Sequence, residues 1–112
     1  MYLNGRGVAK NDKTAVEWFR KAADQGHADA QARLGWMYEN GRGLAQDDKM
    51  AVEWYRKAAD QGDAFAQCNL GVMYENGYGV AKDMNKAVEW YRKAAAQGIT
   101  LANQSLKRLG KN

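Results

Sequence analysis

The amino-acid sequence predicts an all-α protein, a solenoid of stacked helical hairpins, from three observations. The first is an internal repeat of 36 residues, which divides the 112-residue chain after Asn4 into the units 5–40, 41–76 and 77–112. The second is a helical spacing of apolar residues inside each unit. The third is the presence of 12 glycines, several of which follow the ends of helical patterns, in a chain without proline. Together they predict one repeat domain over residues 1–112.

The repeat is strong in the first two units and weaker in the third. Units one and two are identical at 26 of 36 positions, and units two and three at 18, of which 15 fall in the first 22. The segment 99–112 is therefore expected to form an atypical capping helix at the C-terminus. Residues 1–4 are expected to be the remnant of a preceding helix, because Met1 and Tyr2 align with Met37 and Tyr38.

Each unit contains two helical patterns. In unit two, Ala51, Trp54, Tyr55 and Ala58 recur at i, i+3, i+4 and i+7, which marks one face of an amphipathic helix. A second apolar stripe follows in the same unit, and no strand-like alternation competes with it. The predicted helices are 12–24, 28–39, 48–60, 64–75, 84–96 and 100–109.

Residues at the ends of these helices have capping chemistry. Asp47 is the expected N-cap of the helix 48–60, with Asn11 and Asp83 at the matching positions, and Asp63 is the expected N-cap of the next helix. Gly62 comes just after the helix 48–60, where a left-handed residue can close the last turn.

The predicted core repeats with the helices. Aromatic side chains are expected to supply most of the buried area: Trp18, Phe19, Trp54, Tyr55, Trp90 and Tyr91. Gly35 and Gly71 lie inside predicted helices, where a glycine costs about 1 kcal/mol relative to alanine. Their recurrence therefore predicts a close crossing between two helices.

The composition excludes several classes of protein. Hydrophobic residues make up 46% and charged residues 27% of the chain, as in ordinary globular domains. One cysteine cannot form an intrachain disulfide, and no apolar run of about 18 residues predicts a membrane span. No signal peptide is visible at the N-terminus. The single cysteine favours the cytoplasm, whereas a periplasmic or secreted location would require that an export signal had been removed.

Two consecutive motifs identify a family. Residues 28–43 read Ala-x-Ala-Gln-x-x-Leu-Gly-x-Met-Tyr-Glu-Asn-Gly-x-Gly, and residues 47–62 read Asp-x-x-x-Ala-Val-Glu-Trp-Tyr-Arg-Lys-Ala-Ala-x-Gln-Gly. With these motifs the chain resembles the Sel-one-like repeat (SLR) family, relatives of the tetratricopeptide repeats, over essentially its whole length. The resemblance implies a right-handed α-solenoid that serves as a scaffold for protein–protein interaction.

The resemblance also implies where a protein or peptide partner binds, because the first helix of each hairpin lines the concave face of such solenoids. Carried over position by position, it gives a groove of Asp29, Ala32, Arg33, Trp36, Glu39, Asn40, Phe65, Cys68, Asn69, Val72, Glu75, Asn76, Leu101, Gln104, Ser105 and Arg108. Spacing agrees, since positions 29, 32, 33, 36 and 40 lie opposite the stripe of Ala30, Leu34 and Met37.

Within this groove we expect apolar anchors inside a polar rim, an arrangement suited to a bound peptide or helix. The anchors are Trp36, Phe65 and Val72, and the rim consists of Glu39, Asn40, Glu75 and Asn76. The alternative is that Trp36 and Phe65 only fill gaps between repeats, since scattered apolar residues are common on protein surfaces.

The two ends of the chain depart from the family pattern. Lys107 stands where Gly35 and Gly71 stand in the earlier units, and Lys107, Arg108 and Lys111 are expected to give the last helix the polar outer side of a cap. At the other end, the helix 12–24 lacks its usual neighbour. Either the chain is a piece of a longer solenoid, or Tyr2, Leu3 and this helix form the contact of a homo-oligomer.

We expect no enzymatic activity, no metal and no cofactor. The pairs Glu17/Lys21, Glu53/Lys57 and Glu89/Lys93 have the spacing of ordinary helix ion pairs. One histidine, His27, and one cysteine, Cys68, provide no zinc-binding spacing. The alternative is a β-lactamase or penicillin-binding activity, as described for cysteine-rich SLR members, although this chain has no Ser-x-x-Lys motif.

Weak nucleic-acid binding is a further alternative, because the net charge is +4 and Arg-Lys pairs recur at 20–21, 56–57 and 92–93. Each pair has a glutamate one turn earlier, however, which favours a solvated helix face. We therefore expect neither a nucleic acid nor a membrane as a partner.

Overall fold

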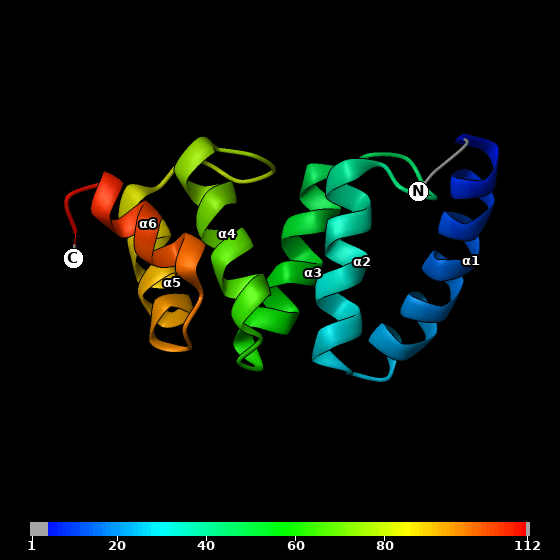
Figure 1. Ribbon diagram of the computed structural model, residues 1–112, viewed down its shortest axis with the longest axis horizontal. Helices are drawn as coiled ribbons and strands as arrows, with labels where there is room; N and C mark the ends of the chain where they lie inside the picture. Colours follow the sequence, from blue (N-terminus) through cyan, green and yellow to red (C-terminus); the bar gives the residue numbers. More distant parts are fainter. Residues whose placement is uncertain (1–4, 112) are drawn as a thin grey trace.

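The structure is a computed structural model, and we describe its residues 5–111, with side chains from Asn11 onward. This part contains the helices α1 (Gly5–Asp24), α2 (Ala28–Asn40), α3 (Asp48–Asp60), α4 (Ala64–Asn76), α5 (Met84–Ala96) and α6 (Thr100–Arg108). They stack side by side along one axis (Figure 1), and the molecule measures 43 × 30 × 26 Å. The predicted all-α solenoid is confirmed.

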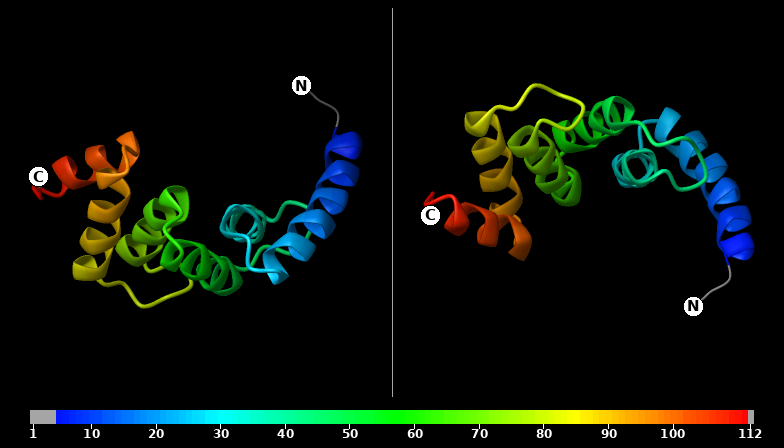
Figure 2. Two further views of the ribbon diagram at one scale, coloured as in Figure 1. Left: turned by 90° about the horizontal axis from the view of Figure 1, so that it is seen from below. Right: turned by 90° about the horizontal axis from the view of Figure 1, so that it is seen from above.

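The row of helices is curved (Figure 2). Its inner side carries α2 and α4, its outer side carries α3 and α5, and its two ends are formed by α1 and α6. The curve therefore turns the first helix of each complete hairpin inward. None of the described helices is both long and apolar enough to cross a membrane.

The sequence predicts both ends of α2 through α6 to within one residue. The carboxylate of Asp47 accepts a hydrogen bond from the Met50 N–H at 3.1 Å, and Asp63 and Asp83 cap α4 and α5 in the same way. Gly62 has a φ of 98°, a value that favours glycine, and follows the last turn of α3. The predicted caps of these helices are confirmed.

The prediction is wrong at the start of α1, which begins at Gly5, so that Asn11 lies inside the helix and does not cap it. In the later repeats the equivalent residues form a loop that is fixed to the preceding helix. The Asp47 N–H, for example, donates to the Tyr38 carbonyl at 2.9 Å. The residue that matches Tyr38 in the first repeat is Tyr2, which lies with the rest of 1–4 outside the described residues. Nothing in the described part of the chain holds 5–11 in the loop conformation.

Two close helix crossings form the centre of the core. The ring of Tyr55 packs against Gly35, and the ring of Tyr91 packs against Gly71. A Cβ atom at either glycine would lie 2.8 Å from the nearest ring carbon, which is too close for any other residue without a shift. Both tyrosines are 0% exposed. The predicted close crossings are therefore confirmed, and they join α2 to α3 and α4 to α5.

The burial of the predicted aromatic core differs between the repeats, and Trp90 of α5 is half-buried although α4 precedes it. Trp54 of α3 is 8% exposed, but Trp18, its equivalent in α1, is 68% exposed. Phe19 is half-buried, whereas Tyr55 at the matching position is fully buried. The expected burial of Trp18 is wrong, because this face of α1 has no covering helix among the described residues.

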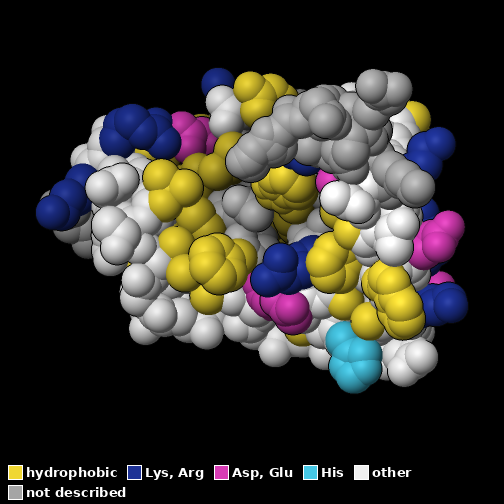
Figure 3. All heavy atoms as spheres, turned by 45° about the vertical axis from the view of Figure 1, so that its right-hand side comes forward, with side chains coloured by type: hydrophobic (Ala, Val, Ile, Leu, Met, Phe, Trp, Pro, Cys, Tyr) yellow, Lys and Arg dark blue, Asp and Glu magenta, His cyan; other side chains and the backbone are white. Residues whose placement is uncertain are grey.

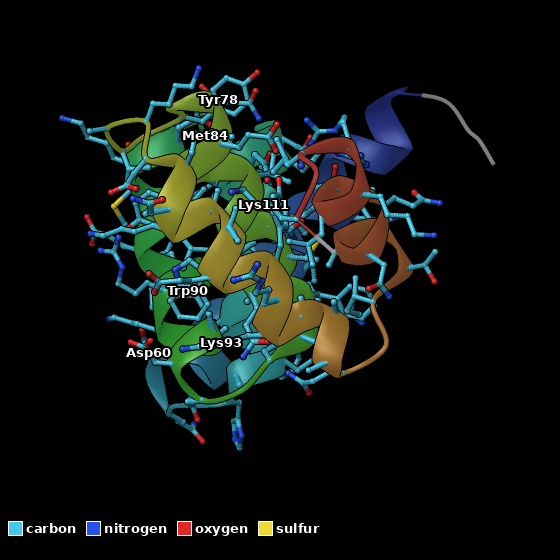
Figure 4. All side chains as sticks on the ribbon, turned by 90° about the vertical axis from the view of Figure 1, so that its left-hand side faces the viewer. Asp60, Tyr78, Met84, Trp90, Lys93 and Lys111 are labelled. Carbon is cyan, nitrogen blue, oxygen red and sulfur yellow. The ribbon has the colours of Figure 1, made fainter. Side chains whose placement is uncertain are left out.

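The lysine of each expected Glu–Lys pair lies over a tryptophan ring on the same helix, within the range of a cation–π contact. The distances from Nζ to the ring centroid are 5.6 Å for Lys21 and Trp18, 4.6 Å for Lys57 and Trp54, and 4.6 Å for Lys93 and Trp90 (Figure 4). The ion pairs found among the described residues join Arg33 to Asp29, Arg42 to Asp12 and Arg108 to Glu75. The lysines therefore lie over the apolar rings instead of pairing with the glutamates.

Candidate functional site

A hollow of about 410 Å³ opens between α1, α2 and the start of α4. Figure 3 shows it on the face toward the viewer, with hydrophobic side chains gathered around it. Its volume lies within the range of ligand pockets, roughly 300–1,000 Å³. Its lining consists of Phe19, Asp29, Ala32, Arg33, Trp36, Met37, Asp63, Phe65 and Asn69.

The structure brings six of the predicted groove residues together around this hollow: Asp29, Ala32, Arg33, Trp36, Phe65 and Asn69. Sequence reasoning missed Phe19, Met37 and Asp63. Phe19 was expected in the core by its match to Tyr55, and it reaches the hollow because no helix of the described part of the chain covers this face of α1. A helical wheel gives no signal for Met37, since that residue also belongs to the buried stripe.

Large apolar side chains in the hollow are open to solvent. Trp36 of α2 is 43% exposed, and Phe65 of α4 is 69% exposed. Val72, the third expected anchor, is half-buried and packs against the core. The exposed pair therefore provides apolar contact area from two different helices.

The charged side chains at the hollow are already paired within the protein. The Arg33 guanidinium donates to Asp29 at 3.2 Å and lies 5.7 Å from the centre of the Phe19 ring. Asp63 accepts the capping hydrogen bond of α4. The hollow is thus an apolar surface with a rim whose charges are largely balanced.

Other predicted groove residues take part in the structure of the helices. Cys68 is 3% exposed and lies in the core, and burial raises the pKa of its thiol, so it is neither open to a partner nor activated as a nucleophile. Asn40 and Asn76 each donate a hydrogen bond to a backbone carbonyl one turn earlier, at 2.9 Å. On α6, Leu101 and Gln104 are exposed but do not line the hollow, and Ser105 is buried.

Two glutamates on the expected rim are held by buried tyrosines. The Tyr55 hydroxyl donates to Glu39 at 2.6 Å, and the Tyr91 hydroxyl donates to Glu75 at 2.6 Å. Burial and the adjacent carboxylate raise the pKa of each tyrosine. Glu75 also accepts two hydrogen bonds from Arg108, at 2.6 and 2.8 Å, which lower its pKa. Arg108 is therefore engaged in the protein itself.

The described residues show no arrangement for metal chemistry. Within residues 11–111, His, Cys, Asp and Glu side chains nowhere gather in a group of three that could hold a metal ion. His27 occupies the N-cap position of α2, but its side chain makes no capping hydrogen bond and is exposed. The described part of the site thus offers surface contacts.

The curved stack of hairpins and the repeated motif define an α-solenoid repeat protein. The family model of the Sel1 repeat matches residues 1–27, 28–63 and 64–99, which together cover most of the chain. The chain belongs to the Sel1-repeat family. Repeats of this family typically form scaffolds for protein interaction that carry no catalytic activity.

Solved structures of the family share this fold. A Sel1 repeat protein from Oxalobacter formigenes is 49% identical with a TM-score of 0.81, over 83% of this chain and 70% of that one. A protective antigen of uropathogenic Escherichia coli strains, which displays an SLR fold, is 42% identical with a TM-score of 0.82, over 84% of this chain. Cysteine rich protein B of Helicobacter pylori is 30% identical with a TM-score of 0.76, over 81% of this chain and 68% of that one.

This chain spans a fifth of the length of the Escherichia coli antigen, 20%, so that protein contains much more than the matched part. No curated protein matches the chain significantly.

Proposed function

We propose that this protein is a non-enzymatic scaffold that binds a peptide or a helix of a partner protein in the hollow between α1, α2 and α4. The observation that carries the proposal is the exposure of Trp36 and Phe65, 43% and 69%, on two helices that line one hollow. Aromatic anchors inside a polar rim contribute most of the affinity in many peptide complexes.

A pull-down with the wild-type protein, followed by titration calorimetry with the captured partner, tests this function. Trp36→Ala and Phe65→Ala should each weaken binding about tenfold or more, as expected for an anchor residue. Their melting temperatures should stay close to that of the wild type. Tyr78→Ala is the matched control, because Tyr78 is an aromatic residue that is 48% exposed but does not line the hollow. Unchanged binding together with a lower melting temperature would show that Trp36 only supports the packing.

The absence of enzymatic activity is the second part of the proposal. Cys68 is the only cysteine, and it is buried in the core with no activating partner. We therefore expect nitrocefin to be hydrolysed no faster than in buffer. Turnover by the purified protein above that rate would remove the scaffold role and support the β-lactamase alternative.

We also propose that nucleic acids are not partners. Arg20 and Arg56 donate hydrogen bonds to the hydroxyls of Tyr38 and Tyr74, at 3.0 and 2.5 Å, and are thus partly engaged within the protein. A steep loss of binding to arbitrary DNA with rising salt would contradict this, because it would reveal many phosphate contacts.

Self-association through α1 is favoured by a separate observation. Ala15, Trp18 and Phe19 match residues of α3 that are buried under α2, yet Trp18 is 68% exposed. A head-to-tail contact with α6 is disfavoured, since Lys107 replaces the glycine over which an aromatic ring would pack. We propose a two-fold dimer of α1 faces. Sedimentation should show a dimer that Trp18→Ala weakens, and a wild-type monomer at high concentration would overturn it.

A further inference from the structure

Two equivalent carboxylates of this molecule have different surroundings. Glu39 and Glu75 occupy the same position in consecutive repeats, and each accepts a hydrogen bond of 2.6 Å from the hydroxyl of a fully buried tyrosine. The tyrosine fixes one oxygen of each carboxylate at the end of a helix crossing. A carboxylate has about four acceptor sites, so each group can accept further bonds.

The two carboxylates differ in whether an arginine binds them, and the arginine that binds Glu75 lies 33 residues later in the chain. Arg108 donates from both terminal nitrogens to the two oxygens of Glu75, at 2.6 and 2.8 Å. One repeat earlier, the residue equivalent to Arg108 is Val72. Its side chain has no hydrogen-bond donor that could bind Glu39. Among the residues whose side chains are described, no basic group forms an ion pair with Glu39. Glu75 thus has a guanidinium partner, and among the described side chains Glu39 has none.

Glu39 is not part of the lining of the apolar hollow, but it lies one helical turn from Trp36, which is. It follows Trp36 by three residues on α2, so the two side chains lie on the same side of the helix. Asn69, which lines the hollow from α4, lies near the Tyr55 hydroxyl that holds Glu39. Basic residues nearby are paired elsewhere, Arg33 with Asp29 and Arg42 with Asp12. A segment that places an apolar side chain in the hollow therefore has a carboxylate within one helical turn.

We propose that Glu39 binds an arginine of the partner peptide in the bidentate geometry that Arg108 shows with Glu75. This proposal rests on the proposed function, and it specifies the partner: a segment with an arginine next to an aromatic or aliphatic residue. Arginine fits better than lysine, because its planar fork matches both oxygens of a carboxylate at once.

The experiment uses a displayed library of random twelve-residue peptides, selected on the wild-type protein. Enriched peptides are synthesised with their arginine intact or replaced by citrulline, an uncharged isostere, and their dissociation constants are measured by fluorescence anisotropy. We expect enrichment of arginine and about tenfold weaker binding of the citrulline peptides.

Variants of the protein test whether Glu39 is the residue that recognises the arginine. Glu39→Gln keeps an acceptor for Tyr55 but should remove the preference for arginine over citrulline. Val72→Arg should remove it as well, because the new side chain would occupy Glu39 as Arg108 occupies Glu75. Val72→Met is the matched control, and it should keep the preference since it adds length without charge. The melting temperature of each variant is recorded, and a variant that fails to fold is replaced by Glu39→Ala.

Two outcomes would overturn the inference in different ways. Peptides that depend on Trp36 but bind equally well with arginine and citrulline would leave the groove in place and exclude the arginine site. A selection that yields no peptide sensitive to Trp36→Ala would overturn the groove itself, and the arginine site with it.

Discussion

The helices α1 and α3 have nearly the same sequence over their second halves, but they occupy different environments. The segment Ala-Val-Glu-Trp occurs in both, followed by Phe19 in α1 and Tyr55 in α3. In α3 the aromatic residues are covered by α2, and Tyr55 is 0% exposed. In α1 the matching face is uncovered, and Trp18 is 68% exposed. A repeat therefore does not determine burial by itself, because each hairpin depends on its neighbour for half of its core.

The largest expected effect on stability comes from the aromatic residue that follows the tryptophan, which is Tyr55 in α3 and Phe19 in α1. Tyr55→Ala should lower the free energy of unfolding by about 4 kcal/mol, because it leaves a cavity in the crossing of α2 and α3. Phe19→Ala should cost about 1 kcal/mol, since Phe19 is half-buried at the edge of the stack. Urea denaturation followed by circular dichroism measures both. Equal losses would contradict this difference in burial between the two helices.

A second comparison concerns the glycine crossings and the C-terminal end. Gly71→Ala should destabilise the protein by about 2 kcal/mol, because a Cβ atom 2.8 Å from the Tyr91 ring forces the two helices apart. Lys107→Ala, at the matching position of α6, should change stability by less than about 0.5 kcal/mol, since the lysine is exposed. Thermal unfolding of both variants is the measurement. A tolerated alanine at Gly71 would contradict the close crossing.

A third comparison concerns the helix caps. Asp47→Ala removes the hydrogen bond to the Met50 N–H and should cost about 1 kcal/mol. Asn11→Ala should be neutral or slightly stabilising, because Asn11 lies inside α1, where alanine is the better helix former. Chemical denaturation of the two variants distinguishes these cases. A similar loss at both positions would restore the start of the first helix near residue 12.

The smallest effect concerns pH at the C-terminal end. Arg108 holds the pKa of Glu75 below its ordinary value, so this carboxylate stabilises the fold above the pKa it has in the unfolded chain. That contribution is lost as the pH falls through the lowered pKa of the folded state. Arg108→Met should therefore reduce stability at neutral pH and flatten its decline in acid. Melting temperatures between about pH 6 and pH 2 test this, and parallel curves for both proteins would refute it.

Much of the fold follows from the sequence because local chemistry repeats with the helices. Asp47, Asp63 and Asp83 predict three helix starts, and Gly35 and Gly71 predict the crossings. These features depend on residues within one hairpin or between adjacent hairpins. The start of α1 could not be predicted in this way, since a loop at 5–11 would depend on contacts to a helix before it.

The site was harder to predict, because exposure depends on which helices lie together. Trp36 and Phe65 could be placed on the inward face from helical spacing and family resemblance. Helical spacing could not decide between a buried and a groove-lining Cys68, since the equivalent Ala32 is only 8% exposed and yet lines the hollow. Arg108 and Glu75 are 33 residues apart and lie on different helices, so only the three-dimensional stack brings them together.

Lys107 has a consequence for protein engineering. The crossings of α2 with α3 and of α4 with α5 each need a glycine. Because Lys107 stands at the matching position of α6, we expect that a further repeat added after α6 would not pack against it. An extra module should instead be inserted after Asn76, as a second copy of residues 41–76. Such an insertion would keep α6 as the last helix and lengthen the solenoid by one repeat. The contacts on both sides of the inserted repeat would be ones that the protein already contains.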